Sequence, residues 1–436
     1  MGEEIAIVGA GIAGLGTAYF LGPHRRVTVF EQDGRLGGHA HTIDLEESGR
    51  RLPMDVGFMV YNEITYPLLT RLFRELGVAT KPTSMSFSVR DDRSGLEYCG
   101  SSVNHLFAQR RNLLRPGFWR FLLRIDRFNR EAVEALEDPS TREVTLEEYV
   151  AARGYGSDFL QHFLIPMSGA VWSAPPSEML RFPAATLLRF FHNHGFLGLH
   201  TQHPWRTVEG GSRAYVSRLA ARVGDRFNCG RAVVAVVRQA DGVDLKFADG
   251  GIRRFDRVVL ACHADQALGL LADPTARERS LLGAFRYQSN PVTVHTDAAV
   301  MPRKRLAWAS WNYRLAADRQ GCSTHYWMNS LQGVSDVRNY FVSLNADSLV
   351  KPSSVVRQLR AEHPLFGLDA VRAQAELPTL NRPGSRTFYC GSYFRYGFHE
   401  DALMSAHQAS TALLEGDPWN RKTLPLRGPA VEGLAA

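Results

Sequence analysis

The chain has 436 residues, long enough for two or three domains, and 44% of its residues are hydrophobic, an ordinary fraction for a globular protein. No run of eighteen apolar residues predicts a membrane-spanning helix, and the N-terminal residues lack the positive region and cleavage site of a secretory signal. The net charge of +7 comes from scattered basic residues without a nucleic-acid-binding motif, so we expect no nucleic-acid partner, whereas an anionic membrane surface or an acidic substrate would suit the charge.

Cysteine usage predicts a reducing compartment. The five cysteines are odd in number, far apart in the sequence and never in a CxxC spacing. Disulfide frameworks belong to secreted proteins, so buried, reduced thiols in the cytoplasm are the expected state.

The first 45 residues predict a strand, a glycine turn, a helix and a second strand, from the stretches EIAIVGA, AGLGTAYFL and RVTVFEQ. Residues 66–77 predict an amphipathic helix, because five apolar side chains recur at helical spacing and Gly77 follows as a C-terminal stop. From about residue 80 to 204 the pattern changes to helical segments rich in aromatic residues, with proline-containing turns such as SAPPSE.

Strand patterns return after residue 205. Residues 232–262 alternate apolar and polar side chains across turns at Asp241-Gly242 and 249–251, which predicts an antiparallel meander followed by a buried strand. The rest of the chain predicts strands over 285–350, a strand, loop and helix over 386–414, and a flexible tail over 421–436.

Nucleotide-domain patterns occur at the start, in the middle and at the end of the chain, so we expect both domains to be discontinuous. The predicted nucleotide-binding domain comprises residues 1–80, 205–290 and 385–420. The predicted substrate-binding domain comprises residues 81–204 and 291–384.

The stretch from Gly9 to Gly14 predicts a dinucleotide site. Gly9 permits a tight turn, Gly11 lets the backbone approach a pyrophosphate, and Gly14 allows the helix to pack closely on the strand. The helix N-terminus offers free amide groups to the anion. Glu31 closes the second strand 17 residues after Gly14, where a carboxylate can bind ribose hydroxyls.

The loop EQDGRLGGHAHT favours FAD over NAD. After Glu31 it carries Arg35 and the pair Gly37-Gly38. A simple nicotinamide enzyme has no need of this element, whereas a large two-part cofactor needs a second backbone clamp and a cation near its pyrophosphate. FAD is therefore the expected cofactor.

Four separated elements resemble the flavin-containing amine oxidoreductase superfamily, which includes amine oxidases, protoporphyrinogen oxidase and phytoene desaturases. They are the glycine turn with Glu31 and the Arg35-Leu36-Gly37-Gly38 loop, then MDVGFMVYN, TVEGGSRAYVSRLA and YCGSYFRYGFHEDALMSAHQAS, in this order. The resemblance spans about residues 4–412. It implies an α/β protein in which a Rossmann-like, GR2-type FAD-binding domain is interleaved with an α+β substrate domain.

The resemblance also implies cofactor contacts at matched positions. Glu31 would bind the adenosine ribose, Arg35 would lie near the pyrophosphate, and the backbone of Val233 would contact the adenine end. A helix starting at residues 398–400 would present its positive end to the flavin pyrimidine, where reduced flavin carries negative charge. The expected cofactor-binding residues are Gly9, Ala10, Gly11, Ile12, Ala13, Gly14, Glu31, Gln32, Arg35, Gly37, Gly38, His39, Gly57, Phe58, Val233, Gly391, Ser392, Phe398, His399 and Glu400.

Two departures from the superfamily pattern bear on the reaction. Many amine oxidases carry a lysine on a substrate-domain strand near the flavin, but the matching stretch YQSNPVTVHTD offers Asn290, Pro291 and Val292, and the nearest lysine is Lys304. Simple amine oxidation is therefore less expected. The chain has a single dinucleotide fingerprint, so oxygen, a quinone or another carrier is the expected electron acceptor rather than a nicotinamide fed through a second domain.

The stretches GGHAHT, VVLACHADQAL and WASWNY resemble most a bacterial branch of NAD/FAD-binding proteins that occur beside cyclopropane-fatty-acid synthases. The resemblance implies an oxidoreductase that takes a hydride from an apolar, lipid-like small molecule such as an unsaturated or methylated fatty acyl chain. Amine oxidation and flavin-dependent double-bond isomerisation are the alternatives. A non-enzymatic binding protein, like the Rab GDP-dissociation inhibitors of the same fold, is disfavoured by the intact Arg35-Leu36-Gly37-Gly38 and Gly391 segments.

The spacings predict neither a catalytic triad nor a metal site. His39-Ala40-His41 and His192-Asn193-His194 lack further ligands at a supporting spacing, so we expect no metal. His41, Tyr61 and His399 are the candidates for catalytic contact with the flavin or the substrate. Hydride transfer depends on geometry and exclusion of water more than on an acid–base pair.

Residues 115–136 predict an amphipathic helix with two alternative roles. One face carries Phe118, Phe121, Leu122, Ile125 and Phe128, and another carries Arg120, Arg124 and Arg127. The helix could pack in the core with its basic face in solvent, or it could contact a membrane surface, which suits aromatic and arginine side chains. Peripheral contact with the inner face of a membrane is therefore an open expectation, and no oligomeric state is predicted.

Overall fold

The computed structural model describes residues 3–198, 201–317 and 321–420. These residues form two compact units. Unit 1 comprises residues 3–38, 216–283 and 376–420, and unit 2 comprises the other described residues. The predicted tail over 421–436 lies outside the described residues.

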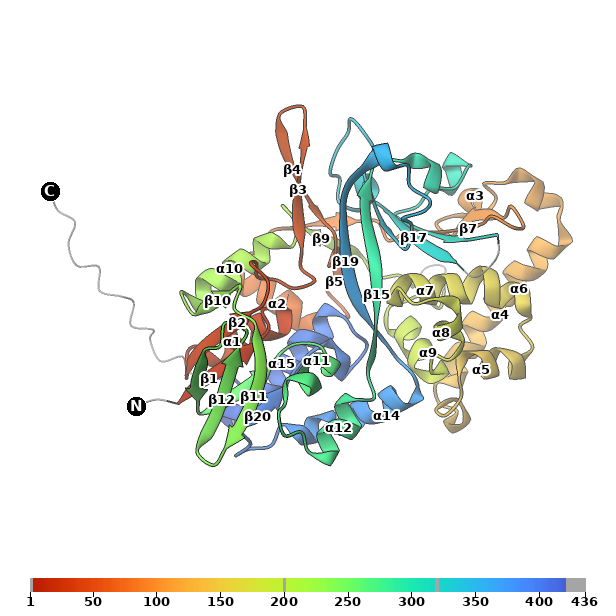
Figure 1. The fold of residues 1–436 in the computed structure, drawn as a ribbon. Helices are drawn as coiled ribbons and strands as arrows, with labels where there is room; N and C mark the ends of the chain where they lie inside the picture. Colours follow the sequence, from red (N-terminus) through yellow and green to blue (C-terminus); the bar gives the residue numbers. More distant parts are fainter. Residues whose placement is uncertain (1–2, 199–200, 318–320, 421–436) are drawn as a thin grey trace. The chain divides into compact units, whose positions relative to one another are not determined.

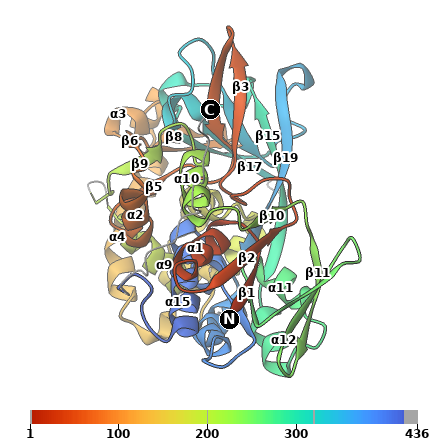
Figure 2. The same ribbon diagram turned by 90° about the vertical axis from the view of Figure 1, so that its left-hand side faces the viewer.

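Unit 1 is built on a five-stranded parallel sheet. Its strand order is β10 (Phe227–Cys229), β2 (Arg26–Glu31), β1 (Glu4–Val8), β14 (Arg257–Leu260) and β20 (Thr387–Tyr389). Helix α1 (Ile12–Leu21) packs on β1 and β2, and α15 (His399–Leu414) packs on α1 (Figure 2). A β-carbon at Gly16 of α1 would lie 2.7 Å from Leu403 of α15, so the small residue permits this close helix contact. The predicted strand, turn and helix at both ends of the chain are thereby confirmed.

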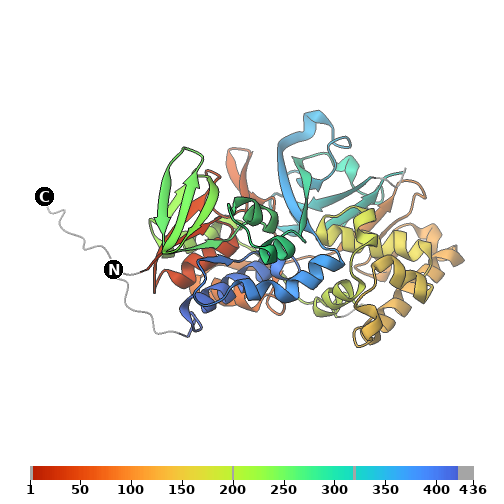
Figure 3. The same cartoon turned by 60° about the horizontal axis from the view of Figure 1, so that its bottom comes forward.

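A second sheet of unit 1 is the predicted antiparallel meander, drawn in bright green (Figure 3). Its strands are β11 (Val233–Gln239), β12 (Gly242–Phe247) and β13 (Ile252–Phe255). The first turn lies at Ala240-Asp241, one residue before the predicted pair. The second turn falls at the predicted residues, and Gly250 there has a left-handed φ of 83°, which favours glycine. Helices α11 (Ala264–Leu270) and α12 (Ala276–Leu282) follow β14.

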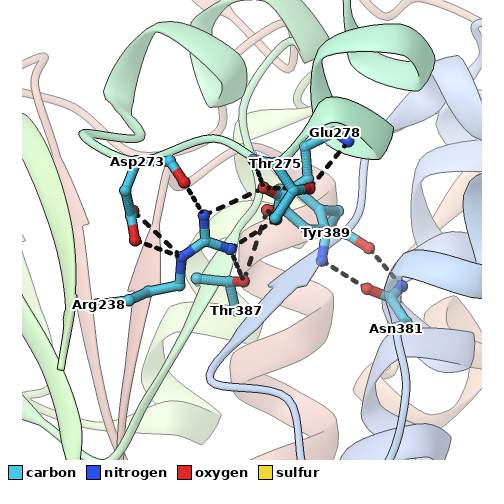
Figure 4. A network of polar contacts seen from close by, with 7 residues as sticks. All are labelled: Arg238, Asp273, Thr275, Glu278, Asn381, Thr387 and Tyr389. Carbon is cyan, nitrogen blue, oxygen red and sulfur yellow. Dashed lines mark hydrogen bonds and ion pairs between the residues drawn. The ribbon is translucent and has the colours of Figure 1, made fainter. Parts of the chain in front are cut away.

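Arg238 on β11 joins this meander to α12 and β20 through a polar network (Figure 4). Its Nη1 lies 2.8 Å from Glu278 Oε1, and its Nε lies 3.2 Å from Asp273 Oδ1. The Tyr389 hydroxyl donates to Glu278 Oε1 at 2.5 Å, and the Thr275 amide donates to Glu278 Oε2 at 2.8 Å. The buried Glu278 carboxylate is thus the centre of the network.

Unit 2 contains a seven-stranded sheet. Its order is β19 (Val355–Leu365), β15 (Arg286–His295), β18 (Phe341–Leu344), β17 (Cys322–Trp327), β16 (Trp311–Leu315), β7 (Phe87–Asp91) and β8 (Glu97–Cys99). β15 and β19 run together as a long antiparallel pair (Figure 1). Strands β7 and β8 correct the expectation of a helical region from residue 80. They are too short to show a periodic pattern, and they are fixed by pairing, β7 with β16 and β8 with β7.

The predicted helical region of unit 2 is confirmed over residues 103–193, drawn orange to yellow-green as one group (Figure 3). The helices are α3 (Val103–Leu106), η1 (Arg110–Leu114), α4 (Pro116–Ala135), η2 (Pro139–Thr141), α5 (Leu146–Arg153), α6 (Ser157–Phe159), η3 (Leu160–Leu164), α7 (Ile165–Trp172), α8 (Pro176–Leu180) and α9 (Ala184–Asn193). On α4 the side chains of Phe118, Phe121 and Phe128 are buried, so the predicted apolar face packs in the core.

Two smaller sheets complete unit 2. One is the hairpin β3 (Thr42–Glu47) with β4 (Arg50–Asp55), and the other has the order β5 (Tyr61–Asn62), β9 (Trp205–Val208), β6 (Thr80–Thr83). The predicted helix α2 (Pro67–Leu76) ends at Gly77, whose φ of 64° is left-handed and favours glycine. The remaining elements belong to both units. They are α10 (Arg213–Val223), η4 (Ala298–Val300), η5 (Arg305–Ala307), α13 (Met328–Leu331), η6 (Pro352–Ser354), α14 (Leu368–Glu376), η7 (Leu377–Leu380) and η8 (Ser392–Phe394).

The boundaries of the two compact units differ from those of the predicted functional domains. Residues 39–80, 205–215 and 284–290 pack in unit 2, and residues 376–384 pack in unit 1. Across the described ranges, no helix is both long enough and apolar enough to cross a membrane.

Candidate functional site

The turn after β1 requires glycine because neighbouring backbone atoms leave no space for a side chain at Gly9. Gly9 has a φ of 100°, and a β-carbon there would lie 2.7 Å from the carbonyl oxygen of Ala261. Gly11, the N-cap of α1, faces open space, since a β-carbon there would meet no atom within 4 Å. The first amides of α1 therefore border a space that a phosphate group could enter.

The loop with Gly37 and Gly38, the predicted second backbone clamp, lies directly against this turn. The Gly37 amide donates to the Ala10 carbonyl at 2.8 Å, and Gly37 forms a parallel bridge with Gly11. Gly38 has a φ of 57°, and a β-carbon there would lie 3.0 Å from Gly11 Cα. Side chains at these positions would fill the space beside the helix N-terminus.

Glu31 is half-buried at the end of β2, where its carboxylate organises the turn. Its Oε2 accepts from the Ala10 amide at 2.7 Å and its Oε1 from the Asp33 amide at 2.9 Å. A carboxylate has further lone pairs, so these bonds leave acceptor capacity for ribose hydroxyls. The Glu31 carbonyl accepts from the Arg231 amide at 2.9 Å, which brings the segment before Val233 to the same edge of unit 1.

The C-terminal segment places Gly391 beside β14 and α15. The Gly391 amide donates to Ser405 Oγ at 2.8 Å, and a β-carbon at Gly391 would lie 2.5 Å from the Tyr393 ring. Thr17 of α1 lies 3.5 Å from the thiol of the preceding residue, Cys390. These contacts tie the predicted phosphate and flavin segments of unit 1 to one another, although they come from opposite ends of the chain.

Helix α15 begins at His399, as predicted, with Phe398 in extended conformation before it. Sequence reasoning missed Asp401 in its first turn. Asp401 Oδ2 accepts from the Phe398 amide at 2.9 Å and the Tyr396 amide at 3.2 Å. Burial raises the pKa of Asp401 to about 7, so the charge at this helix start depends on pH near neutrality. Its signal was an acidic residue three positions after the N-cap.

The predicted contacts His39, Gly57 and Phe58 belong to unit 2, where they meet one another. The Phe58 amide donates to the His39 carbonyl at 2.8 Å, and the Val56 amide donates to the His41 carbonyl at 2.9 Å. A β-carbon at Gly57 would lie 2.1 Å from the His39 carbonyl oxygen, so the pairing requires glycine.

The catalytic candidate Tyr61 has a structural position. Its side chain is only 2% exposed, its ring packs edge-on against Tyr66 and Phe73, and its hydroxyl lies 3.3 Å from Thr80 Oγ1. Tyr61 therefore belongs to the core of unit 2. His41 and His399 are both partly exposed.

A polar cluster around the buried Asn290 was not predicted as a unit, because it joins β15 to β19 and to Asn345, which follows β18. Asn290 Oδ1 accepts from Gln288 Nε2 at 3.0 Å and Asn345 Nδ2 at 2.9 Å. Asn290 Nδ2 lies 2.9 Å from His363 Nδ1. Because Asn290 uses its oxygen for the two amides, its amino group must donate to His363 Nδ1, which fixes that ring as an acceptor there. The His39 and His363 rings lie 5.7 Å apart.

A second unpredicted network surrounds Asp55, from the MDVGFMVYN stretch. Its Oδ1 accepts from the Ser212 hydroxyl at 2.6 Å and the Thr42 hydroxyl at 2.6 Å, and its Oδ2 accepts from Gln332 Nε2 at 2.7 Å. Burial raises the pKa of Asp55, and these hydrogen bonds oppose that shift. Asp55 thus anchors the turn at Gly211, where a φ of 81° requires glycine.

The described residues of unit 1 fit a flavin dinucleotide on structural grounds. The space in front of Gly11 is bordered by helix amides, by the Gly37-Gly38 backbone and by the Glu31 carboxylate, which are the groups that bind a pyrophosphate and a ribose. A family model described as flavin-containing amine oxidoreductase matches residues 12–414. The chain belongs to this family. It is an FAD-dependent oxidoreductase, and the predicted family and cofactor are confirmed.

Individual known proteins are similar to this chain in sequence or in fold. Protoporphyrinogen oxidase 2 of Arabidopsis thaliana is 28% identical over 190 residues, which cover 41% of this chain and only 34% of that protein. Cyclohexylamine oxidase from Brevibacterium oxydans matches with a TM-score of 0.67 at 16% identity, over 95% of this chain and 99% of that one. A CLA-producing fatty acid isomerase from P. acnes matches with a TM-score of 0.67 at 14% identity, over 93% and 97%. The predicted fold class is confirmed.

Proposed function

We propose that this oxidoreductase takes a hydride from an apolar, lipid-like substrate, such as an unsaturated or methylated fatty acyl chain. The observation that carries the proposal is the uncharged cluster around Asn290. At the stretch where many amine oxidases carry a lysine, Asn290 is fully buried and bonded to Gln288, Asn345 and His363.

Amine substrates are cations at neutral pH, and proteins bind cations with carboxylates or aromatic faces. The side chains of the Asn290 cluster are amides and an imidazole that accepts a hydrogen bond at Nδ1. Gln288 and His363 are partly exposed, and such groups can position a carbonyl or carboxyl oxygen of an acyl substrate without placing a charge beside its apolar chain. The fold also carries a fatty acid isomerase, so its architecture is compatible with an acyl substrate.

The contributions of the chain are positioning and exclusion of water. Bound FAD supplies the hydride acceptor. The glycine turn, the Gly37-Gly38 loop and the Gly391 segment would hold the cofactor, and His41 and His399 are the candidates for contact with substrate. The Asn290 cluster would orient the acyl group so that its hydride faces the flavin.

The proposed FAD-binding domain comprises residues 1–80, 205–290 and 385–420, and the proposed substrate domain comprises residues 81–204 and 291–384. Oxygen or a quinone would take the electrons from the reduced cofactor. The reaction would take place in the cytoplasm, where an acyl substrate is reached at the inner face of the membrane.

The test is anaerobic mixing of the purified yellow protein with extracted bacterial phospholipids in detergent, with cyclohexylamine and polyamines as the competing panel. We expect the flavin absorbance to bleach with lipid, and the acyl product to lose two hydrogens. Bleaching by amines alone would overturn the proposal in favour of amine oxidation. A product of unchanged mass with a moved double bond would identify an isomerase instead.

Asn290→Ala should slow flavin reduction by the lipid without changing the flavin content. Gln358→Ala, at an exposed position on the neighbouring strand β19, is the matched control, and lipid should reduce its flavin at the normal rate. Equal reduction rates in the two variants would remove the Asn290 cluster from the reaction.

A further inference from the structure

Exposed apolar side chains gather in one short part of unit 2. Among the described residues, five of the twelve exposed large hydrophobic side chains fall between residues 103 and 123. Leu114 is 88% exposed, Val103 71% and Leu123 65%, while Leu113 and Trp119 are each 46% exposed. This is a second apolar set, separate from the phenylalanines of α4 that pack in the core.

These side chains lie on α3, η1 and the first half of α4, and two contacts join these elements. Trp119 Nε1 donates to the Leu113 carbonyl at 3.0 Å, which places the indole over η1. The Phe107 ring, which follows α3, lies 5.2 Å from the Trp119 ring. Leu123 follows Trp119 by one helical turn and so shares its face. We call these five apolar residues and the arginines between them the α3–α4 surface.

The α3–α4 surface is also strongly basic. Residues 98–125 contain five arginines and no aspartate or glutamate. Arg124 pairs with Asp158. In the part of the chain that the structure describes, none of the other four forms a salt bridge, and Arg110 is held by the Phe107 carbonyl at 3.0 Å and by Asn104. The four arginines of the surface are Arg110, Arg111, Arg115 and Arg120, all exposed.

More positive charge borders the surface. The short helix η5 packs beside α3 and β8, and the residues before it, Arg303 and Lys304, are exposed. Their amides donate to the Glu97 carboxylate at 2.9 and 3.0 Å, so this basic turn is fixed in place. Glu97 itself is 3% exposed and leaves little negative charge at the surface.

We infer that unit 2 docks on an anionic lipid surface through the α3–α4 surface. Exposed leucines and a tryptophan next to arginines that form no salt bridge match an interface in which the apolar side chains enter the acyl region and the arginines meet phosphate groups. A second copy of the chain would bring arginines against arginines, which disfavours self-association through this surface. The choice of lipid over an acidic protein rests on the proposed function, whereas the surface itself does not.

The test is co-sedimentation of the holoenzyme with vesicles of equal parts phosphatidylglycerol and phosphatidylcholine, and with vesicles of phosphatidylcholine alone. We expect binding to the anionic vesicles to be stronger by roughly tenfold or more, and to weaken as salt is added. A double variant, Leu114→Ser with Leu123→Ser, and a second one, Arg115→Glu with Arg120→Glu, should each lose about tenfold or more in vesicle affinity.

Two controls isolate the surface. Val133→Ser changes a half-exposed residue on the same helix α4, and Val337→Ser changes a 73% exposed residue elsewhere in unit 2, so both should bind vesicles normally. Flavin reduction by detergent-solubilised lipid should be unchanged in all variants. The inference would be overturned if the protein did not bind anionic vesicles, or if the surface variants bound them as well as the wild type. It would also be overturned if the wild type were a dimer and the surface variants were monomers. Failure of lipid to reduce the flavin in detergent would instead count against the proposed function alone.

Discussion

Gly14 packs directly on the carbonyl oxygen of Gly9: a β-carbon at Gly14 would lie 1.9 Å from that oxygen. Gly14→Ala must therefore displace α1 from the end of β1. We expect a loss of about 1–3 kcal/mol in the free energy of unfolding. The purified variant should also hold less flavin than the wild type. Thermal unfolding and the flavin-to-protein absorbance ratio measure the two effects.

Gly11→Ala should separate cofactor binding from folding. The φ of Gly11 is −71°, which alanine accepts, and its side chain would point into open space. We expect an apoprotein of normal stability that binds FAD at least about tenfold more weakly, because the methyl group occupies the phosphate position. Gly34→Ala, on the exposed loop after Asp33, is the control. Normal flavin content in Gly11→Ala would contradict the assigned phosphate site.

Asp401 should make stability fall as the pH rises. An unfolded aspartate releases its proton near pH 3.8, whereas the buried Asp401 has a pKa of about 7. Between these values the folded state keeps a proton that the unfolded state has lost, so its advantage shrinks as the pH increases. Neighbouring Arg395 lowers this pKa and Glu400 raises it.

Asp401→Asn should flatten this part of the stability curve. Thermal unfolding of both proteins across the range from pH 4 to pH 8 measures the slope, with the exposed Asp369→Asn as control. If wild type and Asp401→Asn show the same slope, Asp401 is ionised throughout and the assignment is wrong.

Two buried histidines joined through Ser343 in the seven-stranded sheet should make stability fall as the pH decreases, which is the opposite of the effect of Asp401. Ser343 Oγ lies 2.7 Å from both His295 Nε2 and His325 Nδ1, and the Asp297 amide donates to His295 Nδ1 at 3.1 Å. His295 must then donate from Nε2 to Ser343, and Ser343 must donate to His325, so both rings are neutral. Burial lowers the pKa of His295 to about 4 and that of His325 well below its ordinary value.

Unfolded histidines take up protons as the pH falls below about 6.5, and these two do not until the pH is much lower. Stability is therefore lost as the pH falls from about 6.5 towards 4, by on the order of 3 kcal/mol for His295 alone. Ser343→Ala should cost about 1–3 kcal/mol at neutral pH by leaving a buried ring nitrogen unsatisfied. Urea unfolding of this variant is compared with that of Ser140→Ala, which changes an exposed serine. Equal unfolding midpoints would contradict the hydrogen-bonded chain of His295, Ser343 and His325.

The network around Glu278 should outweigh a surface ion pair of similar geometry. Glu278→Ala removes the buried partner of Arg238 and Tyr389 and should cost about 3–5 kcal/mol. Glu376→Ala removes the exposed partner of Arg277, at 3.0 Å, and should cost less than about 1 kcal/mol. Urea unfolding of the two variants measures both losses in the free energy of unfolding. An equal or larger loss for Glu376→Ala would show that burial does not govern the strength of these ion pairs.

Local sequence patterns predicted the elements whose chemistry is local. The turn from Gly9 to Gly14, the Gly37-Gly38 loop and the start of α15 all carry their signal within a few residues. The strand β7 and the Asn290 cluster escaped prediction because they depend on partners more than 50 residues away, such as β16 for β7 and His363 for Asn290. Asp401 was missed for another reason: a capping carboxylate looks like any acidic residue in a first turn until its burial is known.

The central position of β1 in its sheet has a consequence for biosynthesis. The Glu4 amide donates to Asp256 Oδ2 at 2.7 Å, 252 residues later, and β20 then closes the other side of β14. A nascent chain leaving the ribosome therefore exposes the unpaired edge of β1 until β14 has been made. Chaperones that shield apolar strands should be needed early in synthesis, and truncated chains ending before β20 should aggregate rather than accumulate as a folded N-terminal fragment.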